Sequence, residues 1–88
     1  MIHRLEAVHR LKTWPPYFAD VEAGAKTFEI RQNDRDFQVG DILILQEYYP
    51  ETKHYTGFEI RVKVNYTVSL DGLPGLPEGL IGMGIQLT

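Results

Sequence analysis

Three charged side chains within six residues form the clearest chemical pattern in the chain. Lys26, Glu29 and Arg31 follow a glycine with the spacing G-x-K-x-x-E-x-R. Residues two apart on a strand project from one face, so Glu29 and Arg31 are expected to share a face. Phe28 and Ile30 are expected to anchor the opposite face. A carboxylate between two cations can hold both in place, or it can accept a hydrogen bond from a ligand while the cations bind phosphate or carbonyl oxygens.

The same pattern has a simpler interpretation as a surface ion-pair ladder, in which each exposed pair contributes about 0–1 kcal/mol. If the pattern lines a cleft, Lys12 is a candidate second cation, and Arg35 is placed to lean over it from the following turn. Trp14 and Tyr17 are candidates for stacking on a nucleobase, which contributes about 1–3 kcal/mol per base. The alternative is that Trp14 closes one end of a barrel and Tyr17 packs the helix.

Prolines, glycines and the alternation of apolar and polar residues predict the helix and strands on either side of this pattern. Residues 7–12 predict a first strand, which the prolines at 15 and 16 end. The same prolines favour a helix over about 15–23, for which Gly24 is a natural C-terminal cap. Residues 27–32 predict the next strand, with Lys26 at its start. Residues 33–36, Asn-Asp-Arg-Asp, predict a turn.

The second half of the chain predicts β-structure. Residues 42–45 are apolar on both faces, as expected for a strand between a core and a covering element. Residues 80–87 predict a last strand, loosened by two glycines. The sum is a mixed, mainly β fold: a small β-barrel of about five to six strands with one or two short helices. A long strand with one buried face is predicted from alternating apolar residues, which are Phe58, Ile60, Val62, Val64, Tyr66, Val68 and Leu70.

Length and composition narrow the class of protein. A chain of 88 residues is predicted to form one domain over 1–88. It has no cysteine, which excludes a disulfide, a zinc–thiolate site and a thiol nucleophile, and its three histidines (His3, His9 and His54) lack metal-ligand spacing. No metal or cofactor is expected, and His9 is interpreted as a half-buried histidine with a hydrogen-bond partner. No apolar run approaches a membrane span, and the N-terminal segment does not resemble a secretory signal, so a cytoplasmic location is expected.

The charge is unevenly distributed along a chain whose formal net charge is −3. Residues 1–35 carry six Lys or Arg against five Asp or Glu, whereas residues 36–88 carry three against seven. A protein that grips long duplexes non-specifically is usually basic, so any anion site here is expected to be small, local and within the first half.

The pattern resembles the signature of the ASCH superfamily of PUA-like β-barrels. The likeness extends to Leu-Lys-Thr-Trp-Pro at 11–15 and Asn-Asp-Arg-Asp-Phe at 33–37. With these segments included, the chain is similar to a small ASCH-like family found in bacteria and phages. The resemblance implies an RNA- or nucleotide-binding cleft beside the first helix. One branch of the superfamily hydrolyses the amide of N4-acetylcytidine with the motif lysine and a threonine three positions later. The lysine matches Lys26, but Glu29 occupies the threonine position.

Three hypotheses follow. The main one is a module that binds RNA or a nucleotide through Lys12, Trp14, Tyr17, Lys26, Glu29, Arg31 and Arg35. The alternative is a small amidohydrolase acting on an acylated nucleoside, with Lys26 and Glu29 as catalytic residues. The third is a protein that works through protein contacts, for which Leu73 and Leu76 are the candidate surface.

Overall fold

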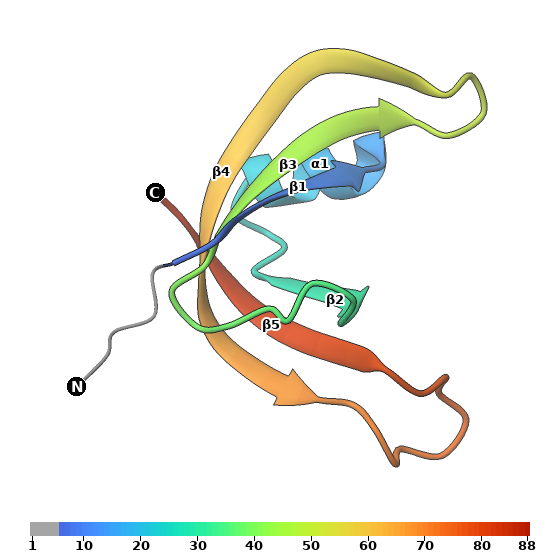
Figure 1. The fold of residues 1–88 in the computed structure, drawn as a ribbon. Coiled ribbons are helices and arrows are strands. Elements are labelled where there is room, and N and C mark those ends of the chain that lie inside the picture. Colours follow the sequence, from blue (N-terminus) through green and yellow to red (C-terminus); the bar gives the residue numbers. More distant parts are fainter. Residues whose placement is uncertain (1–5) are drawn as a thin grey trace.

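A computed structural model describes residues 6–88, so His3 and the predicted non-secretory N-terminal segment lie wholly or partly outside the described residues. The described chain forms five strands and one helix, in agreement with the predicted mainly β fold (Figure 1). In chain order, these elements are β1 (Val8–Thr13), α1 (Pro15–Glu22), β2 (Phe28–Gln32), β3 (Ile42–Tyr49), β4 (His54–Ser69) and β5 (Leu80–Leu87).

The strands form one sheet in the order β1-β3-β4-β5-β2. The pairing of β1 with β3 is parallel, and the other three pairings are antiparallel. The sheet curls into a half-barrel, with β1 and β2 as its two edges (Figure 1). The long β4 contributes to both halves of the curl because it pairs with β3 through its first part and with β5 through its second.

Arginine side chains bridge the boundary between the two edge strands, which we call the seam. Arg31 of β2 donates from Nη2 to the carbonyl oxygen of Lys12 in β1 at 3.0 Å. Arg35, in the loop after β2, donates from Nη1 to the carbonyl oxygen of Arg10 at 2.8 Å. These bonds satisfy two carbonyl oxygens on the edge of β1 that has no partner strand.

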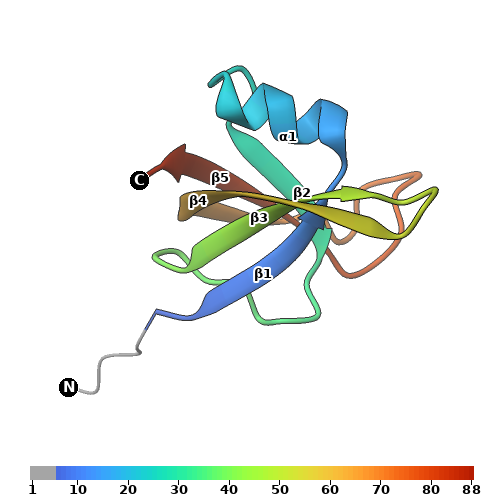
Figure 2. The ribbon, with the colours of Figure 1, turned by 90° about the horizontal axis from the view of Figure 1, so that it is seen from above.

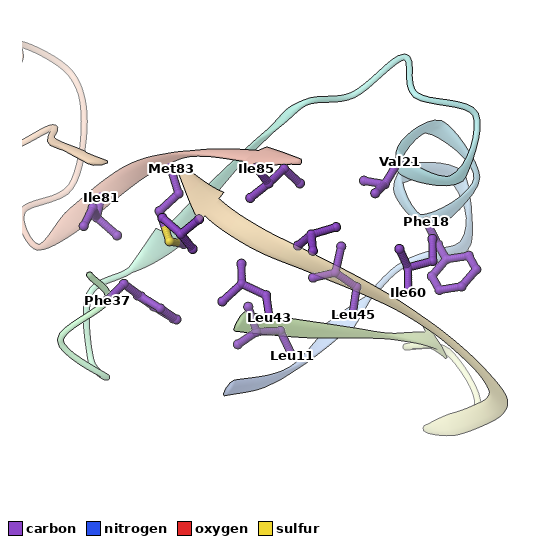
Figure 3. Close-up of a cluster of buried hydrophobic side chains, with 12 residues drawn as sticks. Leu11, Phe18, Val21, Phe37, Leu43, Leu45, Ile60, Ile81, Met83 and Ile85 are labelled. Atoms are coloured by element: carbon purple, nitrogen blue, oxygen red, sulfur yellow. The ribbon is translucent and has the colours of Figure 1, made fainter. Parts of the chain in front are cut away.

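The core fills the inside of the curl. Helix α1 lies on one side of the curled sheet and contacts β3 (Figure 2). Its two buried residues, Phe18 and Val21, are three apart and therefore share a face of the helix. They join apolar side chains from the strands and from Phe37 in one cluster (Figure 3). The strand residues in that cluster are Leu11, Leu43, Leu45, Ile60, Val62, Val64, Ile81, Met83 and Ile85.

The alternating pattern of β4 predicts one buried face along its whole length, and this prediction is wrong at both ends. Ile60, Val62 and Val64 are buried, but the register with β5 shifts between Val64 and Tyr66. The extra residue of a bulge moves the following side chains to the other face. Tyr66 is therefore 64% exposed, on the outer face. Phe58, at 69%, lies in the part of β4 nearest the β3–β4 hairpin.

A buried polar cluster ties the start of β3 to β1. Asp41 is fully buried and accepts the backbone N–H of Ala7 at Oδ1 (3.1 Å) and that of Gln38 at Oδ2 (3.0 Å). His9 Nε2 lies 2.9 Å from Asp41 Oδ2, and the His9 ring meets Phe37 edge-on at 4.8 Å. The prediction that His9 has a hydrogen-bond partner is confirmed.

Over residues 6–88, no helix has the length and apolar character needed to cross a membrane. The same residues contain no group of three or more His, Cys, Asp or Glu side chains arranged to hold a metal ion.

Candidate functional site

The turn from α1 to β2 determines where Lys26 lies. Pro15 begins the helix, as predicted, and Gly24 adopts a φ of +77° just beyond its end. Glycine reaches this left-handed conformation without the clash of a Cβ atom. The backbone N–H groups of Ala25 and Lys26 then both donate to the carbonyl oxygen of Asp20, at 2.9 and 3.0 Å. The chain is thereby folded back under the end of the helix. Lys26 lies in this turn, two residues before β2 begins.

Glu29 binds both cations of the sequence pattern. Its Oε1 accepts from Lys26 Nζ at 2.8 Å, and its Oε2 accepts from Arg31 Nε at 2.9 Å. Lys26 Nζ also donates to the carbonyl oxygen of Phe28 at 2.6 Å, and Arg31 Nη2 lies 3.4 Å from Thr13 Oγ1. The Glu29 side chain is only 5% exposed, against 17% for Lys26 and 27% for Arg31. The trio is therefore a partly buried network and not an exposed ion-pair ladder.

The two faces of β2 are the reverse of those expected. Glu29 and Arg31 share a face, as predicted, but that face is the inner one. Phe28 and Ile30 do not anchor the strand in the core, because each is 52% exposed. A charged residue can replace an apolar one at an inner position when its charge is paired and hydrogen-bonded, and the two cations supply this for Glu29.

The cleft above this trio has a volume of about 450 Å³, which is within the usual range for a small-molecule site. It spans the seam, so residues from β1, α1 and the start of β2 face one another across it. Its lining residues are Lys12, Thr13, Trp14, Tyr17, Lys26, Phe28, Glu29, Ile30 and Arg31. Six of the seven predicted site residues are thus brought together.

Arg35 is the exception, and the structure places it outside this cleft. It lies further along the seam in a separate hollow with Leu11, Asp34 and Phe37, and its guanidinium donates to β1. The predicted turn at 33–36 explains this position. Asn33 Oδ1 accepts the backbone N–H of Phe37 at 2.9 Å, which directs the chain away from the cleft.

Two aromatic side chains form the rim of the cleft. Trp14 and Tyr17 stack with their ring centroids 6.3 Å apart and their planes 26° from parallel. Both are about half exposed, so Trp14 does not close an end of the barrel and Tyr17 does not pack into the core. Lys12 lies on the same side of the seam, where its Nζ is 4.7 Å from the centroid of the Tyr48 ring.

The sequence interpretation missed Thr13 and the cleft role of Phe28 and Ile30. Thr13 is 3% exposed, with its hydroxyl facing Arg31. It lies two residues after the buried Leu11, so alternation along β1 could have assigned it to the inner face. No comparable signal existed for Phe28 and Ile30. Alternation shows which residues of a strand share a face, but it does not show which of the two faces is buried.

The cleft is electropositive in an otherwise acidic chain. Three cations and one carboxylate line it, which gives a formal charge of +2. An ammonium has three hydrogens and a guanidinium five, and the internal bonds of the trio use only part of them. Lys26 and Arg31 therefore retain donors for an oxygen anion or a carbonyl group, and Glu29 fixes where those donors lie.

A family model described as "Domain of unknown function (DUF3850)" matches residues 8–85. The chain belongs to this family. The matched region contains every residue that lines the cleft, so the cleft lies wholly within the DUF3850 domain. No curated protein sequence matches the chain.

Proposed function

We propose that the DUF3850 domain binds a nucleotide or a short single-stranded RNA in the cleft across the seam. The observation that carries the proposal is the buried Glu29 carboxylate, with Lys26 at 2.8 Å and Arg31 at 2.9 Å. A carboxylate that is only 5% exposed and bound at both oxygens is poorly placed to meet a ligand itself. Its role in the proposal is to hold two cations so that they meet phosphate or carbonyl oxygens together.

The aromatic rim makes a nucleotide a better candidate than a simple anion. A phosphate alone would need only cations, whereas Trp14 and Tyr17 offer half-exposed ring faces beside them. Bases of single-stranded nucleic acid stack on such rings, and the accompanying phosphate meets Lys or Arg. The small number of cations, on a chain with a net charge of −3, favours a short ligand over a long duplex.

The resemblance to the ASCH superfamily supports the same proposal, since it implies a PUA-like module with a nucleotide or RNA cleft beside the first helix. We propose a cytoplasmic location for this module, in keeping with a chain that has no cysteine.

The amidohydrolase alternative stays a prediction, and the geometry favours it less. A lysine nucleophile needs a free lone pair on Nζ. The Nζ of Lys26 is instead held between the Glu29 carboxylate and the carbonyl oxygen of Phe28, and it would have to leave these partners to attack a substrate. Incubation with N4-acylated cytidines, followed by chromatography, tests this alternative. Release of the acyl group by the native protein but not by Lys26→Ala would establish it.

Trp14 provides a direct assay of the binding proposal because it is the only tryptophan in the chain. Titration with each ribonucleoside monophosphate and with short single-stranded RNAs is expected to change its fluorescence and to reach saturation. Loss of one charge-assisted hydrogen bond costs about 1.5–3 kcal/mol, so Lys26→Ala should weaken binding about 10- to 100-fold. Lys63→Ala, on the outer face of β4, is the matched control and should bind like the native protein.

Two results would overturn the proposal. The first is the absence of a saturable signal with every nucleotide and RNA, checked by calorimetry. The second is an equal loss of affinity in Lys26→Ala and Lys63→Ala, which would indicate general charge attraction instead of a defined site. Circular dichroism melts of both variants show whether the fold is intact.

A further inference from the structure

The outer face of the sheet carries an apolar furrow beside the proposed ligand cleft, with which it shares Phe28, Glu29 and Ile30. Gly82 and Gly84 of β5 project to this face, because the residues between and beside them are buried in the core. Each glycine is paired with one residue of β2 and one of β4. These four flanking residues are all large and apolar: Phe28, Ile30, Tyr66 and Val68. The glycines form the floor of the furrow and the flanking side chains form its two walls.

Limited space, and not backbone conformation, favours glycine at these two positions. Neither Gly82 nor Gly84 has a positive φ. A Cβ atom on Gly84 would lie 2.5 Å from Asn65 Oδ1 and 3.2 Å from the Cβ of Tyr66. A Cβ atom on Gly82 would lie 3.1 Å from Val68 Cγ1. The β4 wall therefore leans over the glycine floor, and the hollow that remains has a volume of about 340 Å³.

The side chains on both walls of the furrow are exposed. Phe28 and Ile30 are each 52% exposed, Tyr66 is 64% exposed and Val68 is 45% exposed. At roughly 100 Å² for each side chain, the four expose about 400 Å², which is the size of the largest apolar patch on many monomers, and such a patch often has a function. Their exposure follows from two departures from the expected pattern: the inverted faces of β2 and the bulge in β4.

We propose that this furrow is the interface through which the protein pairs with a second copy of itself. A two-fold pairing sets the same patch against itself, so any charge in it would face its own copy. The furrow meets this condition, because the only charged residue lining it is Glu29. That side chain is 5% exposed and bound to Lys26 and Arg31 on the inner side of β2.

The shape of the furrow also suits a second copy. A ridge formed by Tyr66 and Val68 lies beside a glycine floor, so in a two-fold arrangement the ridge of each copy can enter the furrow of the other. Two sheets packed face to face lie about 10 Å apart with their side chains interdigitated, and the missing side chains at Gly82 and Gly84 leave room for this. The furrow supplies about half of the roughly 800 Å² per partner of a standard interface, so the pairing should depend on concentration.

Pairing would also support the ligand cleft. Strand β2 is an edge strand, and within the described chain the only strand that pairs with it is β5. Its outer residues Phe28 and Ile30 line both the furrow and the edge of the cleft, whereas Arg31 lines the cleft and not the furrow. A second copy packed on the outer face would hold the strand that positions Glu29 and Arg31. The proposal does not depend on what the cleft binds.

Light scattering coupled to size-exclusion chromatography, over loading concentrations from about 1 to 300 µM, tests the pairing. The average mass of the native protein should rise with concentration from 10.1 kDa towards twice that value. Tyr66→Lys should remain at 10.1 kDa throughout, because each copy would place a charge in the furrow of the other. Phe58→Lys, at an equally exposed aromatic of β4 outside the furrow, should pair like the native protein. Ile30→Lys, which changes the opposite wall of the furrow, should also remain monomeric. It tests the proposal if Tyr66→Lys fails to fold.

A native protein that stays monomeric at every concentration would overturn the proposal, even if the furrow then bound another protein or a lipid vesicle. A dimer that persists in both Tyr66→Lys and Ile30→Lys would also overturn it. Neither result bears on nucleotide binding, which the Trp14 fluorescence assay measures independently.

Discussion

Replacing Glu29 with glutamine is the most direct test of how the cleft is organised. The Glu29→Gln substitution keeps the shape of the side chain but leaves one oxygen for two cations. The new amide NH₂ would face a donor of either Lys26 or Arg31, so one of the two charge-assisted bonds at 2.8 and 2.9 Å is lost. Such a bond is worth about 1.5–3 kcal/mol. Because both cations are partly exposed, water recovers some of this, and we expect the stability to fall by about 1–2 kcal/mol.

The effect on ligand affinity sets two terms against each other. Both cations are then less firmly held, because one loses its bond and the other keeps only a bond to a neutral amide oxygen. Ordering them again on binding costs about 0.5–1.5 kcal/mol for each of Lys26 and Arg31. Removing a negative charge roughly 6 Å from a bound phosphate gains only about 0.7 kcal/mol in a water-filled cleft, and less in salt. The positioning term is larger, so Glu29→Gln should weaken binding by about 1 kcal/mol, roughly fivefold, although the cleft becomes more positive.

The assay is the Trp14 fluorescence titration at about 150 mM salt, with Glu59→Gln as the control because Glu59 is an exposed strand glutamate that does not line the cleft. The control should bind like the native protein. In a double-mutant cycle, Glu29→Gln should have a much smaller effect once Lys26 has been replaced by alanine, because Glu29 acts through the cations. Equal or tighter binding by Glu29→Gln would refute the positioning role.

Two further predictions concern the elements that support the cleft. Asp41→Ala should destabilise the fold by about 3 kcal/mol or more, because the buried His9 and two partly buried backbone N–H groups lose their acceptor. A urea midpoint like that of the native protein would contradict this prediction. Gly24→Ala should cost about 1–2 kcal/mol through backbone strain alone, since a Cβ atom there would meet nothing within 4 Å. Gly24→Asn, which tolerates a positive φ better, should lose less stability in the same thermal melts, and equal losses would show that φ is not the cause.

Much of the candidate site could be predicted because it depends on short-range rules. Alternation along a strand placed Glu29 and Arg31 on one face, and the glycine cap placed Lys26 at the start of that strand. Lys12, Trp14 and Tyr17 were included through the family resemblance and their residue types, and all three line the cleft. Arg35 was not predicted correctly by proximity in sequence, because the Asn33 turn directs it to a different part of the seam.

The sequence alone determined the order and approximate limits of the helix and the strands, since prolines, glycines and alternating side chains act on their immediate neighbours. Which face of β2 is buried, where β4 shifts its register and which strands form the two edges of the sheet depend instead on the packing of the whole chain. Alternation is symmetrical between the two faces of a strand, so burial depends on what the rest of the chain packs against it. The same assembly brings Lys12 and Arg31, 19 positions apart, to opposite sides of one cleft.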